Sequence, residues 1–203
     1  DLRQQLLRHK ITKIDKVFYS HMHADQTHGI NDLRVFYLKN KNPIPVYADK
    51  ETSKYLLNSF SYCFKKKDDG YPVTLKLNSI KDKFFILNGS KKVLIKSIKV
   101  KHGNVETMCF IIDQKVAYIS DVKEIYKKDH KYFKNLKYLI IDCLRIKEHP
   151  SHLNLKEALD LIDIFSPKKA ILTNLHSDLD YKKLKNSLPL NVIPAYDGLT
   201  IKL

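Results

Sequence analysis

Apolar residues recur along the chain with two spacings, and each spacing predicts one kind of element. Short apolar or alternating runs, typical of strands, occupy residues 13–20, 43–47, 73–102, 107–113, 115–120, 138–144 and 169–173. The long run 73–102 predicts successive antiparallel strands, and residues 107–120 predict a hairpin. The continuous apolar run YLIIDCL predicts a strand buried on both faces. A pair of closing strands is expected near the C-terminus.

A 3.6-residue spacing predicts helices over residues 26–38, 50–60, 155–165 and 181–187. Residues 155–165 have the clearest pattern, with Leu155, Ile162 and Phe165 on one face. Asn154 is placed to cap the start of this helix, and Pro167 follows its end. Strands in the middle of the chain with helices on both sides predict a layered α/β sandwich, with helices outside and strands inside.

Four predicted strands end in side chains that can bind a metal ion. The first strand leads into His21 and His23, and later strands end at His102, Asp121 and His176. Loops at strand ends are where folds commonly place chemistry. Any one of these histidines alone is more typical of the surface or the core. Together they indicate a metal site, because a buried strand end gains nothing from clustered imidazoles without an ion.

The spacing H-x-H-x-D has a physical reason. Residues two apart in an extended segment face the same side, so His21 and His23 can bind one ion, and Asp25 can reach a second. Imidazole and carboxylate ligands suit Zn²⁺, with Mn²⁺ or Fe²⁺ as alternatives. A bridging Asp121 would hold two ions about 3.5–4 Å apart. The expected ligand sets are His21, His23 and His102 for one ion, and Asp25, Asp121 and His176 for the other.

Composition is that of one soluble globular domain. The 203 residues are 43% hydrophobic and 29% charged, and charges interrupt every apolar run before it could cross a membrane. The start of the sequence shows no signal peptide. Three cysteines without a C-x-x-C pair favour a reducing, cytoplasmic compartment.

The net charge of +15 comes mostly from lysine, which is spread along the whole chain with many Ile and Asn. This composition is typical of an AT-rich genome and accounts for the charge more simply than a dedicated polyanion patch, for which arginine is the usual residue. The charge still favours an anionic substrate.

The motif and the order of the later ligands resemble the metallo-β-lactamase superfamily, whose signature is H-x-H-x-D-H. Within it, the chain is most similar to the branch of the phosphoribosyl cyclic phosphate phosphodiesterase. The resemblance covers almost the whole chain and rests on DLRQQLL, SHMHADQTHGINDLR, PIPVYAD, VKHGN, YISDV, HPSHLNLKEAL and LTNLHSDLDY. It implies a single domain over residues 1–203 with a four-layer αββα sandwich. The branch has a strand hairpin before DLRQQLL, so we expect an N-terminally incomplete domain with an exposed sheet edge that favours a homodimer.

The resemblance implies the same ligands and adds one departure from the family. Gln26 stands where the family has its remaining second-metal histidine. An amide oxygen is a poorer zinc ligand than imidazole, so the second of two Zn²⁺ sites is expected to be weakened. His28 matches a histidine common in this branch and is not expected to replace the lost imidazole.

The segment HPSHLNLKEAL is similar to a ribonuclease Z motif whose histidine assists phosphodiester cleavage. This likeness implies that His152 donates a proton or binds phosphate, near a helix N-terminus that favours anions; the alternative is a structural loop histidine. His149 is expected beside the substrate. Asp178 and Asp180 can orient His176. The expected catalytic residues are therefore Asp25, as a metal ligand, and His152.

Three functions remain open from the sequence. The first is a phosphodiesterase that attacks a small phosphodiester or cyclic phosphate with a metal-bridged hydroxide, assisted by His152. The second is a ribonuclease Z-like enzyme that acts on RNA, although no long Gly/Pro-rich insertion is present. The third is a catalytically impaired remnant, suggested by Gln26. No membrane partner is expected.

Overall fold

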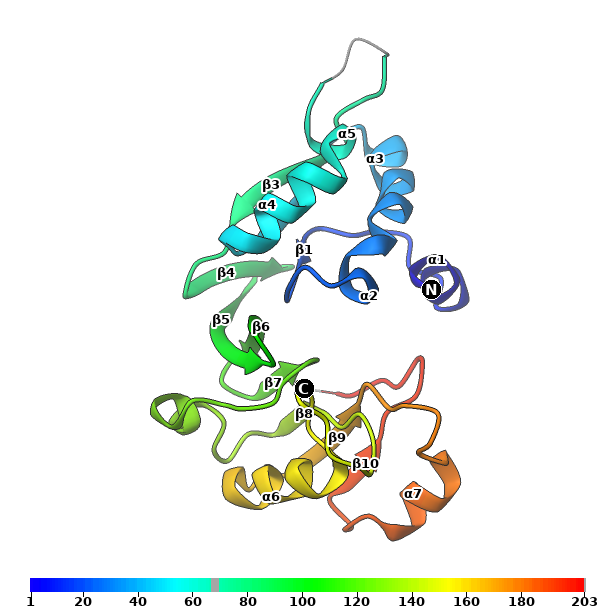
Figure 1. Ribbon diagram of the computed structural model, residues 1–203. Coiled ribbons are helices and arrows are strands. Elements are labelled where there is room, and N and C mark those ends of the chain that lie inside the picture. The colour runs from blue at the N-terminus through cyan, green and yellow to red at the C-terminus, as the bar shows by residue number, and fades with distance from the viewer. Residues whose placement is uncertain (67–69, 203) are drawn as a thin grey trace. The chain divides into compact units, whose positions relative to one another are not determined.

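The computed structural model describes residues 1–66 and 70–202 (Figure 1). The chain divides into two compact units, Asp1–Ile80 and Lys81–Leu203. Each unit contains its own cluster of buried apolar side chains. The units are described one at a time below, and the expectation of a single domain over residues 1–203 stays a prediction.

The first unit contains a three-stranded sheet in the order β1-β2-β3, with both pairs parallel. Its strands are β1 (Val17–Phe18), β2 (Ile44–Ala48) and β3 (Leu75–Ser79). Its helices are α1 (Leu2–Arg8), α2 (Ala24–Thr27), the 3-10 helix η1 (His28–Leu33), α3 (Arg34–Asn40), α4 (Lys50–Ser59) and α5 (Ser61–Phe64). Strand β2 buries every second side chain, Ile44, Val46 and Ala48, as expected for a strand that presents one face to the core.

The helix predicted over residues 26–38 exists as three consecutive helical segments, α2, η1 and α3. Gly29 lies within η1, and an added Cβ there would be 2.9 Å from Leu2 Cβ of α1. The glycine allows the close approach of α1. Ile30, Leu33 and Phe36 still face the core, so the apolar period identified the buried face correctly.

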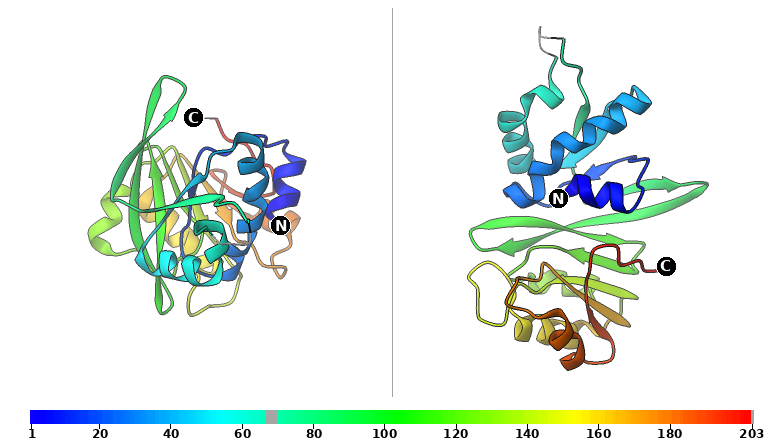
Figure 2. Two further views of the ribbon diagram at one scale, coloured as in Figure 1. Left: turned by 90° about the horizontal axis from the view of Figure 1, so that it is seen from above. Right: turned by 90° about the vertical axis from the view of Figure 1, so that its right-hand side faces the viewer.

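The second unit contains a seven-stranded sheet in the order β10-β9-β8-β7-β6-β5-β4. Neighbours from β4 to β7 pair antiparallel, and those from β7 to β10 pair parallel. The strands are β4 (Lys83–Asn88), β5 (Lys91–His102), β6 (Val105–Ile112), β7 (Val116–Ile119), β8 (Tyr138–Asp142), β9 (Lys169–Thr173) and β10 (Val192–Pro194). A 3-10 helix, η2 (Lys127–Tyr132), precedes β8. Helices α6 (Leu155–Phe165) and α7 (Tyr181–Ser187) lie on the same face of this sheet (Figures 1 and 2).

Helix α6 begins where the sequence indicated. The Asn154 side chain accepts the backbone N–H of Glu157, and the Glu157 carboxylate accepts the N–H of Asn154, which forms a capping box. Ala158, Ile162 and Phe165 are buried against the sheet of the unit. The helix therefore fixes the loop that precedes it, which carries His149 and His152.

Several predicted elements are confirmed, namely the hairpin of β6 and β7, the buried strand β8, helices α4, α6 and α7, and strand β9. Three expectations are wrong. The first strand is only two residues long; β3 pairs in parallel with β2 instead of joining an antiparallel series; and the described residues contain one closing strand, not a pair. Parallel pairing of β3 follows from the helical connection between β2 and β3, which sequence alternation does not reveal.

The mixed α/β class is confirmed in both units, since each combines a sheet with helices. None of the helices in the described ranges is both long and apolar enough to cross a bilayer.

Candidate metal centre and active site

Four strands of the second unit bring polar side chains to one edge of its sheet. Strands β7, β8 and β9 are parallel, and β5 runs in the same direction because both β5 and β7 are antiparallel to β6. Their C-terminal ends carry His102, Asp121, Asp142 and Asn174. The edge is a natural place for a site, because strand ends and their loops leave side chains accessible on a rigid base.

His102, Asp121 and His152 form a compact group at this edge. One ligand atom from each lies within 4.8 Å of the others. The rings of His102 and His152 meet edge to face with centroids 4.5 Å apart, and His152 Nδ1 lies 3.6 Å from Asp121 Oδ1. The backbone carbonyl of Asp121 accepts a 2.8 Å hydrogen bond from Thr107 Oγ1, which fixes the loop after β7.

The carboxylate of Asp142 is hydrogen-bonded to the ring of His152. Its Oδ2 lies 2.8 Å from His152 Nδ1 and also accepts the backbone N–H of Val122 at 3.1 Å. Burial raises the pKa of Asp142, and the hydrogen bonds from His152 and Val122 act in the opposite direction. A carboxylate can only accept, so the Nδ1 of His152 carries a proton and its Nε2 is the atom presented to a ligand.

Asn174 ties the two carboxylates together. Its Nδ2 donates to Asp121 Oδ1 at 2.9 Å and to Asp142 Oδ1 at 3.2 Å. The residue has φ +62°, in the left-handed region that asparagine tolerates better than most residues. Sequence reasoning missed both Asp142 and Asn174. The available signal was their position at the ends of the buried strands YLIID and KAILT.

His102 is oriented by the loop before α6. Its Nδ1 lies 2.6 Å from the carbonyl oxygen of Ser151. A carbonyl only accepts, so Nδ1 carries the proton and the lone pair is on Nε2, the atom that would bind a metal. The next residue, Gly103, has φ +58°, and a Cβ there would lie 2.8 Å from Ser151 Cβ. Only glycine permits this approach without a shift of one of the two segments.

His149 lies beside His152, with ring centroids 5.0 Å apart. Its Nδ1 accepts the backbone N–H of Ser151 at 3.3 Å. The pKa of His149 is lowered, first by burial and then by the positive charges of His152 and Arg145. The neutral imidazole is therefore favoured at this position, and its expected place beside a substrate stays a prediction.

His176 follows β9 and pairs with Asp178, whose Oδ1 lies 2.9 Å from His176 Nδ1. This contact is the one expected from the sequence. Asp180 instead caps α7 by accepting the N–H of Lys183, so its expected contact with His176 is absent from the described residues. The side chain of His176 is 57% exposed and is outside the group of His102, Asp121 and His152. Its role as a ligand stays a prediction.

In the first unit, the segment after β1 places His21 and His23 side by side. His21 Nε2 lies 2.9 Å from His23 Nδ1, and Ser20 Oγ lies 3.1 Å from His21 Nδ1. Two nitrogens bound to one zinc in a tetrahedral arrangement lie about 3.4 Å apart. The spacing is thus close to that of two ligands of one ion. The expected complete set with His102 draws on both units and stays a prediction.

The other predicted residues of the first unit are engaged in hydrogen bonds. Gln26 Nε2 donates to Asp25 Oδ2 at 2.8 Å. His28 Nε2 lies 3.0 Å from the hydroxyl of Tyr55, and its ring packs edge to face on Phe60. These contacts engage His28 within the first unit, and the expectation that it does not replace the missing imidazole stays a prediction.

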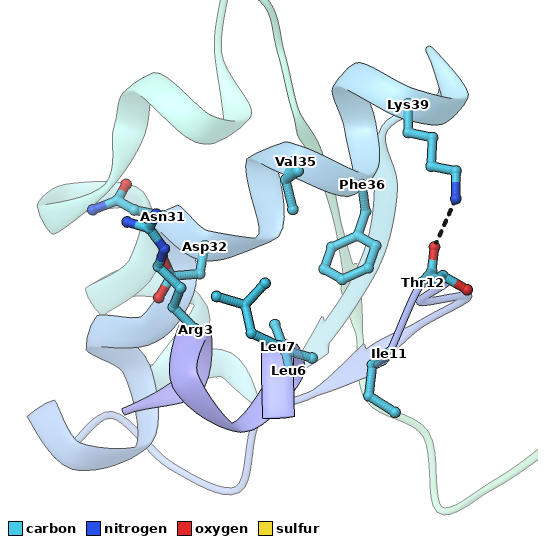
Figure 3. Close-up of a pocket in the computed structure, with 10 residues that line it drawn as sticks. All are labelled: Arg3, Leu6, Leu7, Ile11, Thr12, Asn31, Asp32, Val35, Phe36 and Lys39. Carbon is cyan, nitrogen blue, oxygen red and sulfur yellow. Dashed lines mark hydrogen bonds between the residues drawn. The ribbon is translucent and has the colours of Figure 1, made fainter. Parts of the chain in front are cut away.

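A separate cavity of about 470 Å³ lies between α1 and α3 of the first unit (Figure 3). Apolar side chains of Leu6, Leu7, Val35 and Phe36 line it, and at one side Lys39 Nζ donates to the carbonyl of Thr12 at 3.5 Å. None of its ten lining residues is a predicted metal ligand. The cavity is therefore distinct from the candidate centre.

Comparisons with known proteins place this geometry in a family. A model of the beta-lactamase superfamily domain matches residues 1–174. A Porphyromonas gingivalis protein named octanoyltransferase is 30% identical over 205 residues, which cover 98% of this chain. The chain spans only 40% of the length of that relative, so the named activity is said of that protein.

Solved structures give the same result. A diphosphatase from the PhnP family is 27% identical with a TM-score of 0.87, covering 98% of this chain and 74% of the other. Human tRNase Z, short form, is 16% identical with a TM-score of 0.70, covering 98% of this chain and 84% of the other, which shows a shared fold alone.

The family match covers most of the chain, including residues 21–28, His102, Asp121 and His152. The metallo-β-lactamase fold class expected from the sequence is confirmed. The expected likeness to the branch of the phosphoribosyl cyclic phosphate phosphodiesterase, the PhnP branch, is confirmed as well. This chain belongs to the beta-lactamase superfamily.

Proposed function

We propose that the chain is a metal-dependent phosphodiesterase that hydrolyses a small phosphodiester or cyclic phosphate. The observation that carries the proposal is the group of His102, Asp121 and His152, with Asp142 behind His152, at one sheet edge of one unit. The similarity to a diphosphatase of the PhnP family supports phosphorus–oxygen chemistry over other reactions of the superfamily.

The donors at this edge fit a divalent metal such as Zn²⁺. Two ligands of one zinc lie at most about 4.4 Å apart, twice the metal–ligand distance. The ligand atoms of His102, Asp121 and His152 lie within 4.8 Å, so small side-chain movements would bring any pair of them onto one ion. The imidazole of His102 and the carboxylate of Asp121 are donor types that zinc, manganese and iron share. A divalent cation held here would stabilise negative charge on the phosphoryl oxygens.

In this proposal His102 and Asp121 are ligands and His152 is the proton donor. The Nε2 of His152 can bind a metal or carry a proton, but not both. Asp142 accepts from Nδ1, and such a carboxylate stabilises the imidazolium form that general acid catalysis needs. Protonated Nε2 would then donate to the leaving oxygen. Asn174 donates to both carboxylates and so fixes the position of Asp121 relative to Asp142.

The expected ligands Asp25 and His176 would hold a second ion, and Gln26 weakens that site. The hydrogen bond from Gln26 Nε2 occupies an oxygen of Asp25, which would have to be released for metal binding. An amide nitrogen cannot take over the role of a ligand. We therefore propose full occupancy of one metal position and partial occupancy of the other.

The test measures metal per chain and hydrolysis of bis-p-nitrophenyl phosphate, a 2′,3′-cyclic nucleotide and a diphosphate ester after loading with Zn²⁺ or Mn²⁺. His152→Gln should abolish most hydrolysis and leave metal content unchanged, whereas His102→Gln should lower both. Loss of metal in His152→Gln would assign this residue as a ligand. No hydrolysis of any substrate by the fully loaded parent would refute the phosphodiesterase.

Two further outcomes separate the alternatives. The chain has a net charge of +15, which would attract RNA, so a structured precursor RNA belongs in the substrate panel. Cleavage of that RNA alone, with steep salt dependence, would favour the nuclease. Gln26→His should raise second-metal occupancy; activity that appears only in this variant would identify the natural chain as an impaired remnant.

A further inference from the structure

A second cavity, lined by polar side chains, lies in the unit 81–203, away from the sheet edge that carries His102 and Asp121. Its volume is about 260 Å³, and the residues that give it its character are Lys83, Lys96, Lys131, Lys134, Tyr132 and Gln114. On β5, Lys96 lies six residues before His102, which is about 20 Å along a strand. The cavity is therefore a separate site on the same unit.

Four lysines line this cavity together, although the repulsion between their like charges is unfavourable. Lys83 on β4 and Lys96 on β5 are direct cross-strand partners, so their side chains share one face of the sheet. Like charges at such positions destabilise a sheet. None of the cavity's lining residues is acidic. Among the residues that the structure describes, none of the four lysines forms a salt bridge with a carboxylate.

Tyr132 holds two of these ammonium groups in place. Lys96 Nζ lies 4.3 Å from the centroid of the Tyr132 ring, and Lys131 Nζ lies 5.1 Å from it. Cation–π contacts at these distances are favourable and limit the freedom of both side chains. The carboxylate of Asp113, in the adjoining turn, accepts the backbone N–H of Leu94 at 2.8 Å. Positive charge is therefore concentrated and partly preorganised.

Gln114 adds a neutral donor at a position that is costly for it. It is the second residue of the turn between β6 and β7 and has φ +53°, where glycine is preferred. The turn closes with a hydrogen bond from Lys115 N to Ile112 O. Glutamine brings no advantage to the backbone of this turn, but Gln114 is one of the residues that line the cavity.

We propose that this cavity is a binding site for a small phosphate-bearing anion, with a diphosphate group as the best match. Drug-sized ligands occupy about 300–1,000 Å³, so the cavity of about 260 Å³ suits the anionic group alone rather than a whole nucleotide. Ammonium groups from four lysines suit more than one negative charge. The proposal does not rest on the phosphodiesterase activity.

The experiment titrates the metal-free full chain with inorganic phosphate and with diphosphate, and follows backbone amides by two-dimensional NMR. Diphosphate should shift the amides of Gln114 and Tyr132 and bind more tightly than phosphate. The double variant Lys96→Gln/Lys131→Gln should bind about tenfold more weakly, since an exposed ion pair contributes up to about fivefold. Lys128→Gln is the matched control, because Lys128 lies 5.6 Å from the ring of Tyr126 on the same 3-10 helix but outside the cavity.

A second variant keeps the proposal testable if the double variant unfolds. Gln114→Gly relieves the backbone conformation of the turn, so it should fold at least as well as the parent and still bind diphosphate more weakly. Equal loss of binding in Lys128→Gln, unchanged binding in the double variant, or shifts confined to residues around His102 and His152 would each overturn the proposal. Tighter binding of a single-stranded oligonucleotide than of diphosphate at these same amides would also overturn it in favour of a nucleic-acid surface.

Discussion

The pairing of Asp142 with His152 leads to a sharp prediction, because an isosteric change cannot satisfy all of its contacts. In Asp142→Asn, one of the two acceptor oxygens becomes an NH₂ group. If the amide oxygen occupies the Oδ2 position, the NH₂ faces the Nδ2 of Asn174; if the amide is reversed, the NH₂ faces His152 Nδ1 and the Val122 N–H. Turning Asn174 instead would direct its oxygen toward Asp121 Oδ1. Every arrangement therefore places two hydrogen-bond donors, or two acceptors, against each other.

The size of the effect follows from these contacts. One unsatisfied buried donor costs about 1–3 kcal/mol, and bonds to a neutral acceptor are about 1 kcal/mol weaker than bonds to a charged one. The change also removes the desolvation cost of a buried carboxylate, which the raised pKa of Asp142 reflects. We expect a net loss of about 2–3 kcal/mol in the free energy of unfolding. For a chain of this size the loss corresponds to a Tm lower by about 5–10 °C.

The assay combines urea unfolding, followed by circular dichroism, with long-range ¹H–¹⁵N NMR of the histidine rings. The parent should show His152 with its proton on Nδ1, and Asp142→Asn should weaken this preference, because a neutral amide oxygen binds the proton less strongly than a carboxylate does. Asp160→Asn is the matched control, because Asp160 is 61% exposed and lies 3.9 Å from Lys156, so it should change stability by less than about 0.5 kcal/mol. A parent His152 with its proton on Nε2, or a stability loss in Asp142→Asn no larger than that of the control, would show that Asp142 does not hold His152.

Three other predictions can be checked on the same protein. Asn154→Ala removes the cap of α6 and should lower the free energy of unfolding by about 1 kcal/mol in urea titration, whereas Asn154→Asp should retain most of it. Gly103→Ala should weaken metal binding more than it weakens folding, measured by metal titration beside urea unfolding, because its Cβ would displace Ser151; equal effects on both would contradict this reasoning. Burial raises the pKa of Cys143 to about 12, so about one thiol in ten thousand is ionised at pH 8, and this thiol should react with Ellman's reagent only after denaturation.

The sequence was informative where one segment determines its own structure. The boundaries of α6 could be predicted because Asn154, the apolar period and Pro167 act within a few residues of one another. The hairpin of β6 and β7 is equally local. Strand β3 was assigned to the wrong kind of pairing, because its partner β2 lies some thirty residues earlier and alternation of side chains does not specify which strand pairs with which.

The same distinction explains the site. His102 and Asp121 were identified because a histidine and an acid at strand ends are conspicuous in a chain with only nine histidines, and His152 was identified from the likeness of HPSHLNLKEAL to a ribonuclease Z motif. Asp142 and Asn174 escaped notice because acidic and amide residues at strand ends are common, and their function depends on contacts across β8 and β9. Supporting residues of this kind are defined by the neighbours they meet in space, and only the folded unit reveals them.

The hydrogen bonds of the two units place different demands on metal binding. Around His102 and His152, each Nδ1 is bonded to an oxygen that can only accept, so the lone pair of the neutral ring is on Nε2. Around Asp25, the amide of Gln26 binds the carboxylate that a second ion would need. Metal binding through Asp25 Oδ2 must break this hydrogen bond. Gln26 therefore competes for Asp25 as well as standing in place of a ligand, and on both grounds we expect the second metal position to be the weaker one.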